Sequence, residues 1–308
     1  MGSLSEWIPI QMRQKLTGTE SQHYLDALAA KRKKKVNAFL HAVAQHAVLI
    51  SLSAVFLLPL FLVTVISLMN HGQAQTRSLW PHPFVWHNYF DVFTAVPFLK
   101  WTLNTMFVSV LATIGTVISS VPPAYVLSRL QWRGRGITFI IILSTMMLPG
   151  QVTMIPVYII FAKLHWIPSF LPLIVPAFFA DAFSIFLLRQ FFVSIPDEIS
   201  DAARIDGCSE FKLMMRIIVP LAKPAIMAIA LFSFLGSWNN FFGPLLYIVE
   251  NPNLWTLGIG LNSFQGLHHV EANMMMTASV LFMAPVIILF FFAQKVFIEG
   301  ITLTGVKG

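Results

Sequence analysis

The sequence predicts an all-α, polytopic membrane protein with six transmembrane helices and a long polar loop between the fourth and fifth. Of its 308 residues, 56% are hydrophobic and 11% are charged, whereas a soluble domain carries about 25% charged residues. Six apolar stretches are long enough to cross the hydrocarbon core of a bilayer, which takes roughly 20 helical residues. They run from Ala47 to Met69, Trp101 to Ser128, Ile137 to Phe161, Phe170 to Phe192, Pro224 to Val249 and Ala272 to Phe297.

Prolines inside these stretches leave two interpretations open. Proline removes a backbone donor and kinks a helix, and packed membrane helices tolerate it where neighbours or water satisfy the freed carbonyls. The prolines mark either broken helices that line a shared pathway or ordinary packing kinks. They are Pro59, Pro122, Pro123, Pro149, Pro156, Pro244 and Pro285.

Charge and cysteine content exclude several protein classes. The net charge of +7 comes from basic residues scattered between apolar stretches, which indicates contact with a membrane surface and not with nucleic acid. For the run Lys31–Lys35, binding of anionic lipid or nucleic acid is the less favoured alternative to a role in topology. The single Cys208 excludes an internal disulfide framework and a cysteine-only zinc site. The stretch from Ala47 lies too far from the N-terminus for a signal peptide, so we expect it to be a retained span.

The basic residues also predict an orientation. Seventeen of the 20 lysines and arginines lie before the first span, in the second and fourth loops or after the last span. Only Arg77, Lys100 and Lys163 lie on the opposite side. Because basic residues collect on the cytoplasmic side, both termini are predicted to be cytoplasmic. The expected organisation is a cytoplasmic segment 1–40, a six-span domain 41–298 containing the loop 193–223, and a cytoplasmic tail 299–308.

The loop 193–223 is predicted to form two short helices around a bend. Pro196 suits a first helical turn, and a helix through Ala202 and Ala203 should stop at Gly207, which can take the left-handed conformation. Ser209 can cap a second helix that ends before Pro220. The two alanines should leave a small-residue face on which another protein can sit, with Arg204 and Asp206 at its rim.

This loop resembles the EAA loop of ABC importer permeases, which reads Glu-Ala-Ala, three residues, Gly, nine residues, Ile, one residue, Leu-Pro. Asp replaces Glu and Val replaces Leu here, and both changes keep charge or apolarity. The matching positions are Asp201, Ala202, Ala203, Gly207, Ile217, Val219 and Pro220. The resemblance implies a type I permease fold in which this loop, called the coupling loop below, docks on an ATPase subunit through these residues together with Arg204 and Asp206.

Four further stretches resemble carbohydrate permeases, and the last of them resembles the MalG-like type. They are Ala124–Arg135, Phe186–Phe192, Trp238–Leu245 and the C-terminal end Gln294–Gly308. The resemblance covers roughly residue 40 to the C-terminus, and the first thirty or so residues lie outside it. It implies a subunit of a sugar importer in the bacterial cytoplasmic (inner) membrane.

No Gly-x-x-x-x-Gly-Lys-Ser/Thr phosphate loop occurs in the sequence, so energy must come from a partner. The resemblance implies a second related permease subunit, an ATPase dimer that binds ATP and Mg, and an extracytoplasmic sugar-binding protein. No cofactor is expected on this chain itself, and it is not expected to be an enzyme, because no paired carboxylates, nucleophile with a base or metal motif is found.

The fifth predicted span offers a polar and aromatic cluster that could bind sugar hydroxyls and ring faces. Its members are Trp238, Asn239, Asn240 and Phe241. The asparagines could instead hydrogen-bond to neighbouring helices, which is their commonest use in membranes. Asp181, the only acidic residue deep in a span, is a further candidate, and Gln151 near Pro149 is a weaker one.

Two other transporter classes remain as alternatives. An ion-coupled secondary transporter would need intramembrane titratable groups or broken helices around an ion, and Asp181 alone supports it weakly. An ABC permease for a non-sugar solute is disfavoured by the C-terminal stretch and by the stretch before Arg135.

Overall fold

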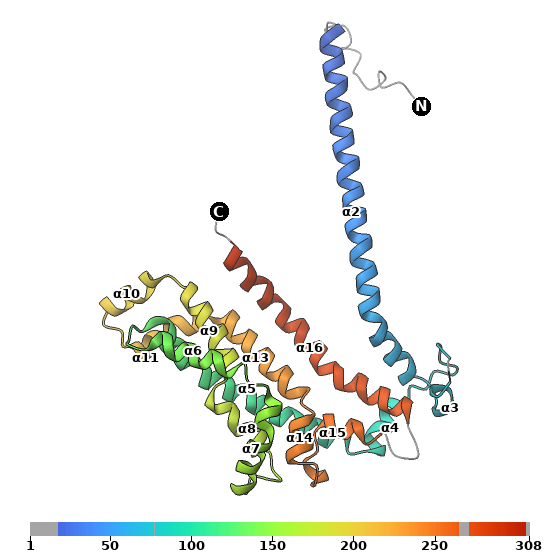
Figure 1. Ribbon diagram of the computed structural model, residues 1–308. Coiled ribbons are helices and arrows are strands. Elements are labelled where there is room, and N and C mark those ends of the chain that lie inside the picture. Colours follow the sequence, from blue (N-terminus) through green and yellow to red (C-terminus); the bar gives the residue numbers. More distant parts are fainter. Residues whose placement is uncertain (1–17, 77, 265–270, 306–308) are drawn as a thin grey trace. The chain divides into compact units, whose positions relative to one another are not determined.

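The computed structural model describes residues 18–76, 78–264 and 271–305, and every regular element in that part of the chain is a helix (Figure 1). The chain forms two units, Met1–Leu62 and Val63–Gly308. Four helices are long and apolar enough to cross a membrane, and two bent helix pairs bring the number of possible spans to six. The predicted number of spans agrees with this upper value.

The first unit consists of most of helix α2 (Gly18–Ser67), whose part Ala29–Ser67 is a candidate span. The helix begins far before the predicted span because residues 24–35 are rich in Ala, Leu and Lys, which favour helix. At 1.5 Å per residue the candidate span is about 58 Å long, roughly twice the hydrocarbon thickness. The run Lys31–Lys35 therefore lies on a helical extension outside the apolar part.

The second unit is built around α5 (Phe98–Arg129). The other helices of this unit are α3 (His71–Ala74), α4 (Asn88–Ala95), α6 (Arg135–Thr145), α7 (Gly150–Lys163), α8 (Leu171–Ile174), η2 (Val175–Phe179), α9 (Ala182–Ser194), α10 (Asp197–Ile205), α11 (Glu210–Leu213), η3 (Met214–Ile218), α12 (Val219–Leu221), α13 (Lys223–Trp238), α14 (Phe242–Tyr247), η4 (Pro252–Leu254), α15 (Leu257–Asn262) and α16 (Ala272–Gly305). Helix α5 packs mainly against α13, α9 and η2, and Figure 1 shows it beside α9 and α13.

Small residues explain the central place of α5. Its buried face carries Thr105, Ser109, Ala112, Gly115 and Ser120, and small side chains allow membrane helices to approach closely. An added Cβ at Gly115 would lie 2.7 Å from the ring of Phe178, so η2 packs on this glycine. Both Pro122 and Pro123 lie inside the continuous helix.

Two apolar cores lie along α5. One joins the C-terminal half of α5 to α9, α10, the segment α11–α12 and the start of α13, with Leu188, Phe192 and Leu213 fully or almost fully buried. The other joins the N-terminal end of α5 to α4, the end of α13, α15 and α16, around the buried Trp101 and Trp238. The coupling loop and the opposite loops thus each rest on a packed core.

Three of the predicted spans are interrupted. The third is the pair α6 and α7, which meet at 91° because Pro149 is extended and disfavours helix at the residue before it. The fourth breaks at Ala180, which has φ 61°. The fifth ends as a continuous helix at Trp238, so its predicted extension to Val249 is wrong. The other prolines inside helices, such as Pro59 and Pro285, do not interrupt them.

The predicted tail lies largely in α16, which continues to Gly305. Residues 306–308 and the N-terminal residues 1–17 are outside the described part of the chain.

Candidate functional site

The coupling loop contains the two helices that the sequence predicts. Helix α10 starts after Pro196, with Asp197 and Glu198 in its first turn, and is followed by Gly207 at φ 76°. Ser209 is the N-cap of α11, although its side chain makes no capping hydrogen bond. The left-handed glycine turns the chain sharply between the two helices, as predicted.

The second helix runs past Pro220, so the predicted end before this proline is wrong. Residues Glu210–Leu221 form one helical segment, which meets α13 at 80°. Its middle part, η3, is a π turn directly before Val219 and Pro220. Since a π turn is wider than an α-helical turn, it accommodates the proline ring, which would clash with a carbonyl four residues earlier in a regular α-helix.

The two alanines of the motif face different ways. Ala203 is 7% exposed and packs in the core against α5 and α9, whereas Ala202 is exposed. Successive helical residues point about 100° apart, so the predicted face containing both is wrong. Asp201, Arg204, Asp206, Gly207 and Pro220 are also exposed. The partly buried Ile217 packs on the same core as Ala203.

Arg129, at the end of α5, joins the central helix to the start of the coupling loop. Its side chain is only 2% exposed, and Nη1 donates to Oδ1 of Asp197 at 2.5 Å. Its Nη2 donates to the carbonyls of Phe192 and Ile195, each at 2.6 Å. The planar guanidinium thus ties the last turn of α9 and the first turn of α10 to α5.

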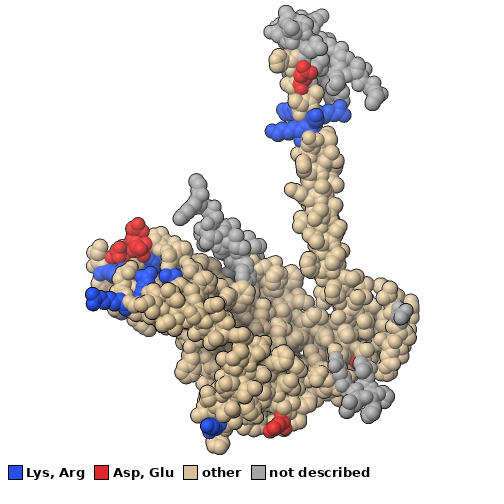
Figure 2. Space-filling view, in the orientation of Figure 1, with Lys and Arg blue, Asp and Glu red and all other residues tan. Residues whose placement is uncertain are grey.

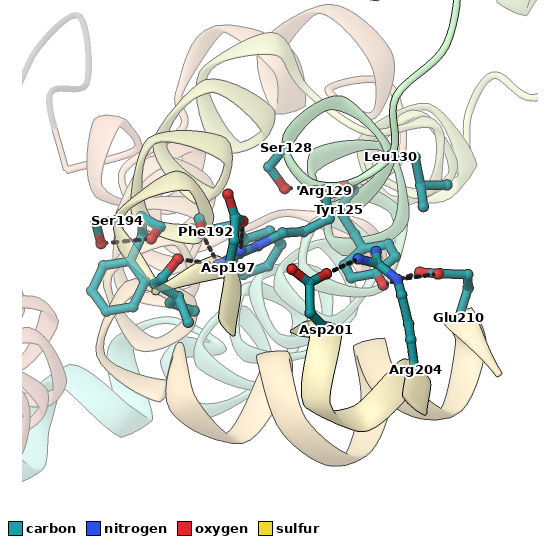
Figure 3. A network of polar contacts seen from close by, with 12 residues as sticks. Tyr125, Ser128, Arg129, Leu130, Phe192, Ser194, Asp197, Asp201, Arg204 and Glu210 are labelled. Carbon is teal, nitrogen blue, oxygen red and sulfur yellow. Dashed lines mark hydrogen bonds and ion pairs between the residues drawn. The ribbon is translucent and has the colours of Figure 1, made fainter. Parts of the chain in front are cut away.

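A second set of polar contacts braces the bend (Figure 3). Arg204 donates from Nη1 to Oδ1 of Asp201 at 3.0 Å and from Nε to Oε1 of Glu210 at 2.8 Å. Tyr125 of α5 donates to Oε2 of the same Glu210 at 2.5 Å. One carboxylate therefore connects α10, α11 and α5.

These contacts shift the ionisation of the two charged groups. Hydrogen bonds from Arg204 and then Tyr125 lower the pKa of the Glu210 carboxyl below its usual value. The hydrogen bond to Glu210 in turn raises the pKa of Arg204. Both groups are charged at neutral pH, so the brace is an ion pair.

Large apolar side chains stand on the polar surface of this loop. Ile205 is 87% exposed and Phe211 is 70% exposed, on either side of Gly207. Sequence reasoning missed them, although an isoleucine and a phenylalanine flanking a glycine bend in a polar loop were a usable signal. It also assigned no contacts to Tyr125, Arg129 and Glu210, because their roles depend on residues more than 60 positions away.

Figure 2 shows a cluster of charged side chains over α10 and α11, a few further charges at the opposite end of the second unit, and wide uncharged surface between them. On the helices between, large apolar residues such as Phe107, Ile140 and Ile155 are more than half exposed. A surface of this kind fits the lipid-facing band of a membrane protein.

Asp181 caps the helix that follows the break in the fourth span. Its Oδ1 accepts from the backbone N–H of Phe183 at 2.9 Å and of Ser184 at 3.2 Å, and the residue is exposed. The neighbouring Ala180 is held by Ser119 of α5, whose Oγ accepts from the Ala180 N–H at 2.9 Å. A left-handed alanine is strained, so this contact helps to fix the break.

The two asparagines form the end of α13. Asn239 is its C-cap and donates to the carbonyl of Leu235 at 2.9 Å, while Oδ1 of Asn240 accepts from the N–H of Gly243 at 3.0 Å. Both residues are exposed. Their side chains satisfy backbone groups at the interruption, which explains why the fifth span does not continue to Val249.

Trp238 and Phe241 are placed differently. Trp238 is fully buried between Phe234 and Phe282 and donates to the carbonyl of Phe282 at 3.3 Å, so its ring faces the core. Phe241 is half-buried at the start of α14. Gln151 is exposed in the first turn of α7, directly after Pro149.

The polar pathway candidates therefore share one property: Gln151, Asp181 and Asn239 each lie at an interruption of an apolar helix. Within the described residues no hydrogen bond joins these three side chains. No cluster of three metal-ligating side chains occurs in that part of the chain either. Irregular backbone at membrane depth is tolerated only inside protein or beside a water-filled cavity, so these interruptions are suited to a polar pathway.

Comparisons with known proteins agree with this architecture. Residues 120–302 match the family described as binding-protein-dependent transport system inner membrane component. The arabinooligosaccharides transport system permease protein AraQ of Bacillus subtilis is 34% identical over 83% of this chain and 92% of its own length. The sn-glycerol-3-phosphate transport system permease protein UgpE of Pectobacterium atrosepticum is 30% identical over 83% and 94%. A chain of a bacterial ABC transporter involved in the import of the acidic polysaccharide alginate superposes with a TM-score of 0.72, at 25% identity, over 86% of this chain and 97% of that one.

Proposed function

Because this chain belongs to the family of binding-protein-dependent transport system inner membrane components, we propose that it forms half of the translocation pathway of an ATP-driven importer for a sugar or sugar-like solute. It is a multi-pass inner-membrane permease subunit and not an enzyme. The names of relatives such as AraQ and UgpE support a carbohydrate or polyol phosphate as cargo. An importer of this class works with a partner permease, an ATPase and a substrate-binding protein.

The observation that carries the proposal is the coupling loop. Two helices bent at Gly207 present Ile205 and Phe211 to solvent, while Arg129 and Tyr125 fix the loop to the central helix. We propose that a cytoplasmic ATPase subunit, one of a pair that binds ATP and Mg, covers these two side chains. Exposed apolar side chains on an otherwise polar surface are typical of a protein interface.

The residues of the EAA-like motif then divide into two roles. Asp201, Ala202, Asp206 and Gly207 are exposed and are assigned to the contact surface. Ala203, Ile217 and Pro220 are assigned to the shape of the loop, since Ala203 and Ile217 pack on the chain's own core. Arg204 braces the bend and lies at the rim of the same surface.

For the solute pathway we propose the interruptions that carry Gln151, Asp181 and Asn239, together with Asn240 and Phe241. Their exposed polar groups can bind sugar hydroxyls, and Phe241 can meet an apolar ring face. The buried Trp238 supports this region from behind by fixing the end of α13 against α16. The partner permease would complete the pathway.

The orientation proposed for the subunit has both termini and the coupling loop in the cytoplasm. In this arrangement the predicted segments 1–40 and 299–308 are cytoplasmic and 41–298 form the membrane domain. The distribution of charge along α5 supports it: Lys100 and Arg129 lie about 44 Å apart along the helix, more than the thickness of the hydrocarbon core. Arg129 then lies on the basic, cytoplasmic side.

Co-purification tests the proposal directly. The tagged chain is extracted from its host in mild detergent, and the co-purifying proteins are identified by mass spectrometry. We expect an ATPase subunit and a second, related permease, and the complex can then be screened for sugars that stimulate ATP hydrolysis in the presence of a binding protein. Recovery of this chain alone from several gentle detergents would instead favour a self-sufficient carrier.

A further inference from the structure

Besides the contacts of Thr116 and Ser119 in its middle part, α5 makes polar contacts to other segments at both of its ends. At the end beside the coupling loop, Tyr125 binds Glu210 of α11 and Arg129 binds Asp197 of α10. The residues Tyr125 and Arg129 are four positions apart and therefore lie on one face of α5. Both helices of the coupling loop are thus attached to the same helix.

At the other end, α5 holds the segment 251–257, which contains η4 and the start of α15. The Nδ2 group of Asn104 donates to the carbonyl of Asn253 at 3.1 Å and to that of Trp255 at 2.9 Å. The buried Thr105 accepts from the backbone N–H of Leu257 at 2.8 Å. These side chains attach the backbone of the segment to α5 at three positions.

Between the two ends α5 is an uninterrupted helix. Asn104 and Tyr125 lie about 32 Å apart along its axis. The covalent route from the coupling loop to the segment 251–257 passes instead through α13, and this route is interrupted at Asn239. A continuous, packed helix transmits a displacement over this distance better than a route with an interruption.

We infer that Tyr125 and Asn104 are positioning residues that make α5 the mechanical link between the coupling loop and the segment 251–257 on the opposite side of the membrane domain. This inference rests on the proposed function, because a partner ATPase must supply the motion of the coupling loop. Through this link, closure of the ATPase pair changes the conformation of the segment 251–257, which in the proposed orientation faces the binding protein.

Hydrogen–deuterium exchange on the assembled complex in lipid nanodiscs tests the link, with ATP and orthovanadate as the probe that traps the ATPases closed. In the wild-type complex, trapping should change the exchange of the coupling loop and of residues 251–257. In Tyr125→Phe and in Asn104→Leu, the coupling loop should still respond, because its apolar contact surface is intact. The change at 251–257 should fall about fivefold in Tyr125→Phe, which loses one hydrogen bond, and by more in Asn104→Leu, which loses two.

Two matched substitutions control for loss of a hydroxyl group alone. Tyr158→Phe removes a tyrosine hydroxyl from α7, outside the proposed link. Thr102→Val removes a hydroxyl of α5 that donates to the carbonyl of Phe98 in the same helix. Both should respond like the wild type. Comparable yields of co-purified ATPase show that all variants are assembled.

The outcomes separate this inference from the proposed function. A wild-type response at 251–257 in both Tyr125→Phe and Asn104→Leu overturns the inference alone. A wild-type complex whose coupling loop responds while 251–257 does not also overturns it. A wild-type preparation that lacks any ATPase overturns the proposed function, and the inference with it.

Discussion

Gly207 is a position where one side chain would change the coupling loop through its backbone alone. Its φ of 76° is strained for any residue with a Cβ, and among the described residues no atom beyond its two chain neighbours lies within 4 Å of the place a Cβ would occupy. We expect Gly207→Val to strain the bend by about 1–2 kcal/mol. The protein should fold and insert, but substrate-stimulated ATP hydrolysis and uptake should both fall.

The matched control for Gly207→Val is Gly136→Val. Gly136 also has open space around it, but it lies in the first turn of α6 without a positive φ. Normal uptake together with normal stimulated ATPase activity in Gly207→Val would contradict the assignment of Gly207 to the coupling contact.

Arg129 gives a second prediction, on assembly. In Arg129→Met the carbonyls of Phe192 and Ile195 lose the Nη2 donor, although that of Phe192 still accepts from the N–H of Ile195. Hydrogen bonds that involve a charged group contribute about 1.5–3 kcal/mol each. We expect a lower thermal stability of the purified subunit and less co-purified ATPase. Arg129→Lys should not restore either, since an ammonium lacks the planar fork that reaches three acceptors.

Arg133→Met serves as the control for Arg129, because Arg133 is exposed in the loop before α6. Equal stability and equal ATPase recovery in Arg129→Met and Arg133→Met would show that Arg129 does not position the coupling loop.

The sequence predicted Gly207 correctly because a single backbone property, the left-handed conformation, determines its role. It failed for Ala203, whose burial depends on which face of α10 meets α5 and α9. It also missed the contacts among Tyr125, Arg204 and Glu210, because Tyr125 meets Glu210 only after α5 has packed against the coupling loop. Roles set by local backbone geometry were predictable, and roles set by tertiary contacts were not.

At the scale of the helices, the closest approach at a described glycine is that of α15 to α5, at Gly260. A Cβ on Gly260 would lie 2.2 Å from the ring of Trp101, which is 3% exposed. We expect Gly260→Ala to displace α15 and to destabilise the subunit by about 1–3 kcal/mol, a typical cost of overpacking. A thermal-shift measurement in detergent checks this.

Gly236→Ala in α13 is the control for that substitution, since in the described part of the chain no atom of another segment lies within 4 Å of the added Cβ. If Gly260→Ala and Gly236→Ala melt at the same temperature, the close packing of α15 on Trp101 is wrong.

The number of membrane-crossing stretches could be read from composition, whereas their interruptions could not. Apolar length predicts a span, and the few polar residues at the breaks, such as Asp181 and Asn239, do not shorten the apolar stretches enough to reveal the interruptions. The presence of proline does not by itself predict a break, since Pro149 lies at one whereas Pro59 and Pro122 lie inside continuous helices. The interruption after Trp238 comes from asparagine side chains that bond to backbone groups.

For the molecule as a whole, Cys208 is a built-in reporter of orientation. It is the only cysteine, lies directly after Gly207 and is partly exposed. We expect a membrane-impermeant maleimide to label it in inside-out vesicles and not in right-side-out ones. Bound ATPase should slow the labelling, because the coupling loop is then covered.

Cys208→Ser provides the blank for the labelling experiment. Labelling from the external side in sealed right-side-out vesicles would reverse the proposed topology and place the basic loops outside the cell.

The central position of α5 has a consequence for how the protein is made. It has the lowest mean hydropathy and the largest buried share of the four long candidate spans, because its face of small and hydroxyl-bearing residues packs on other helices and not on lipid. A nascent segment enters the bilayer according to its own apolarity, so of these four spans α5 is the one that the insertion machinery accepts least readily. Packing against α9 and α13, which are synthesised later, then stabilises α5 in the membrane. Chains truncated before α9 should therefore lose α5 to the wrong side of the membrane more often than the full-length protein does.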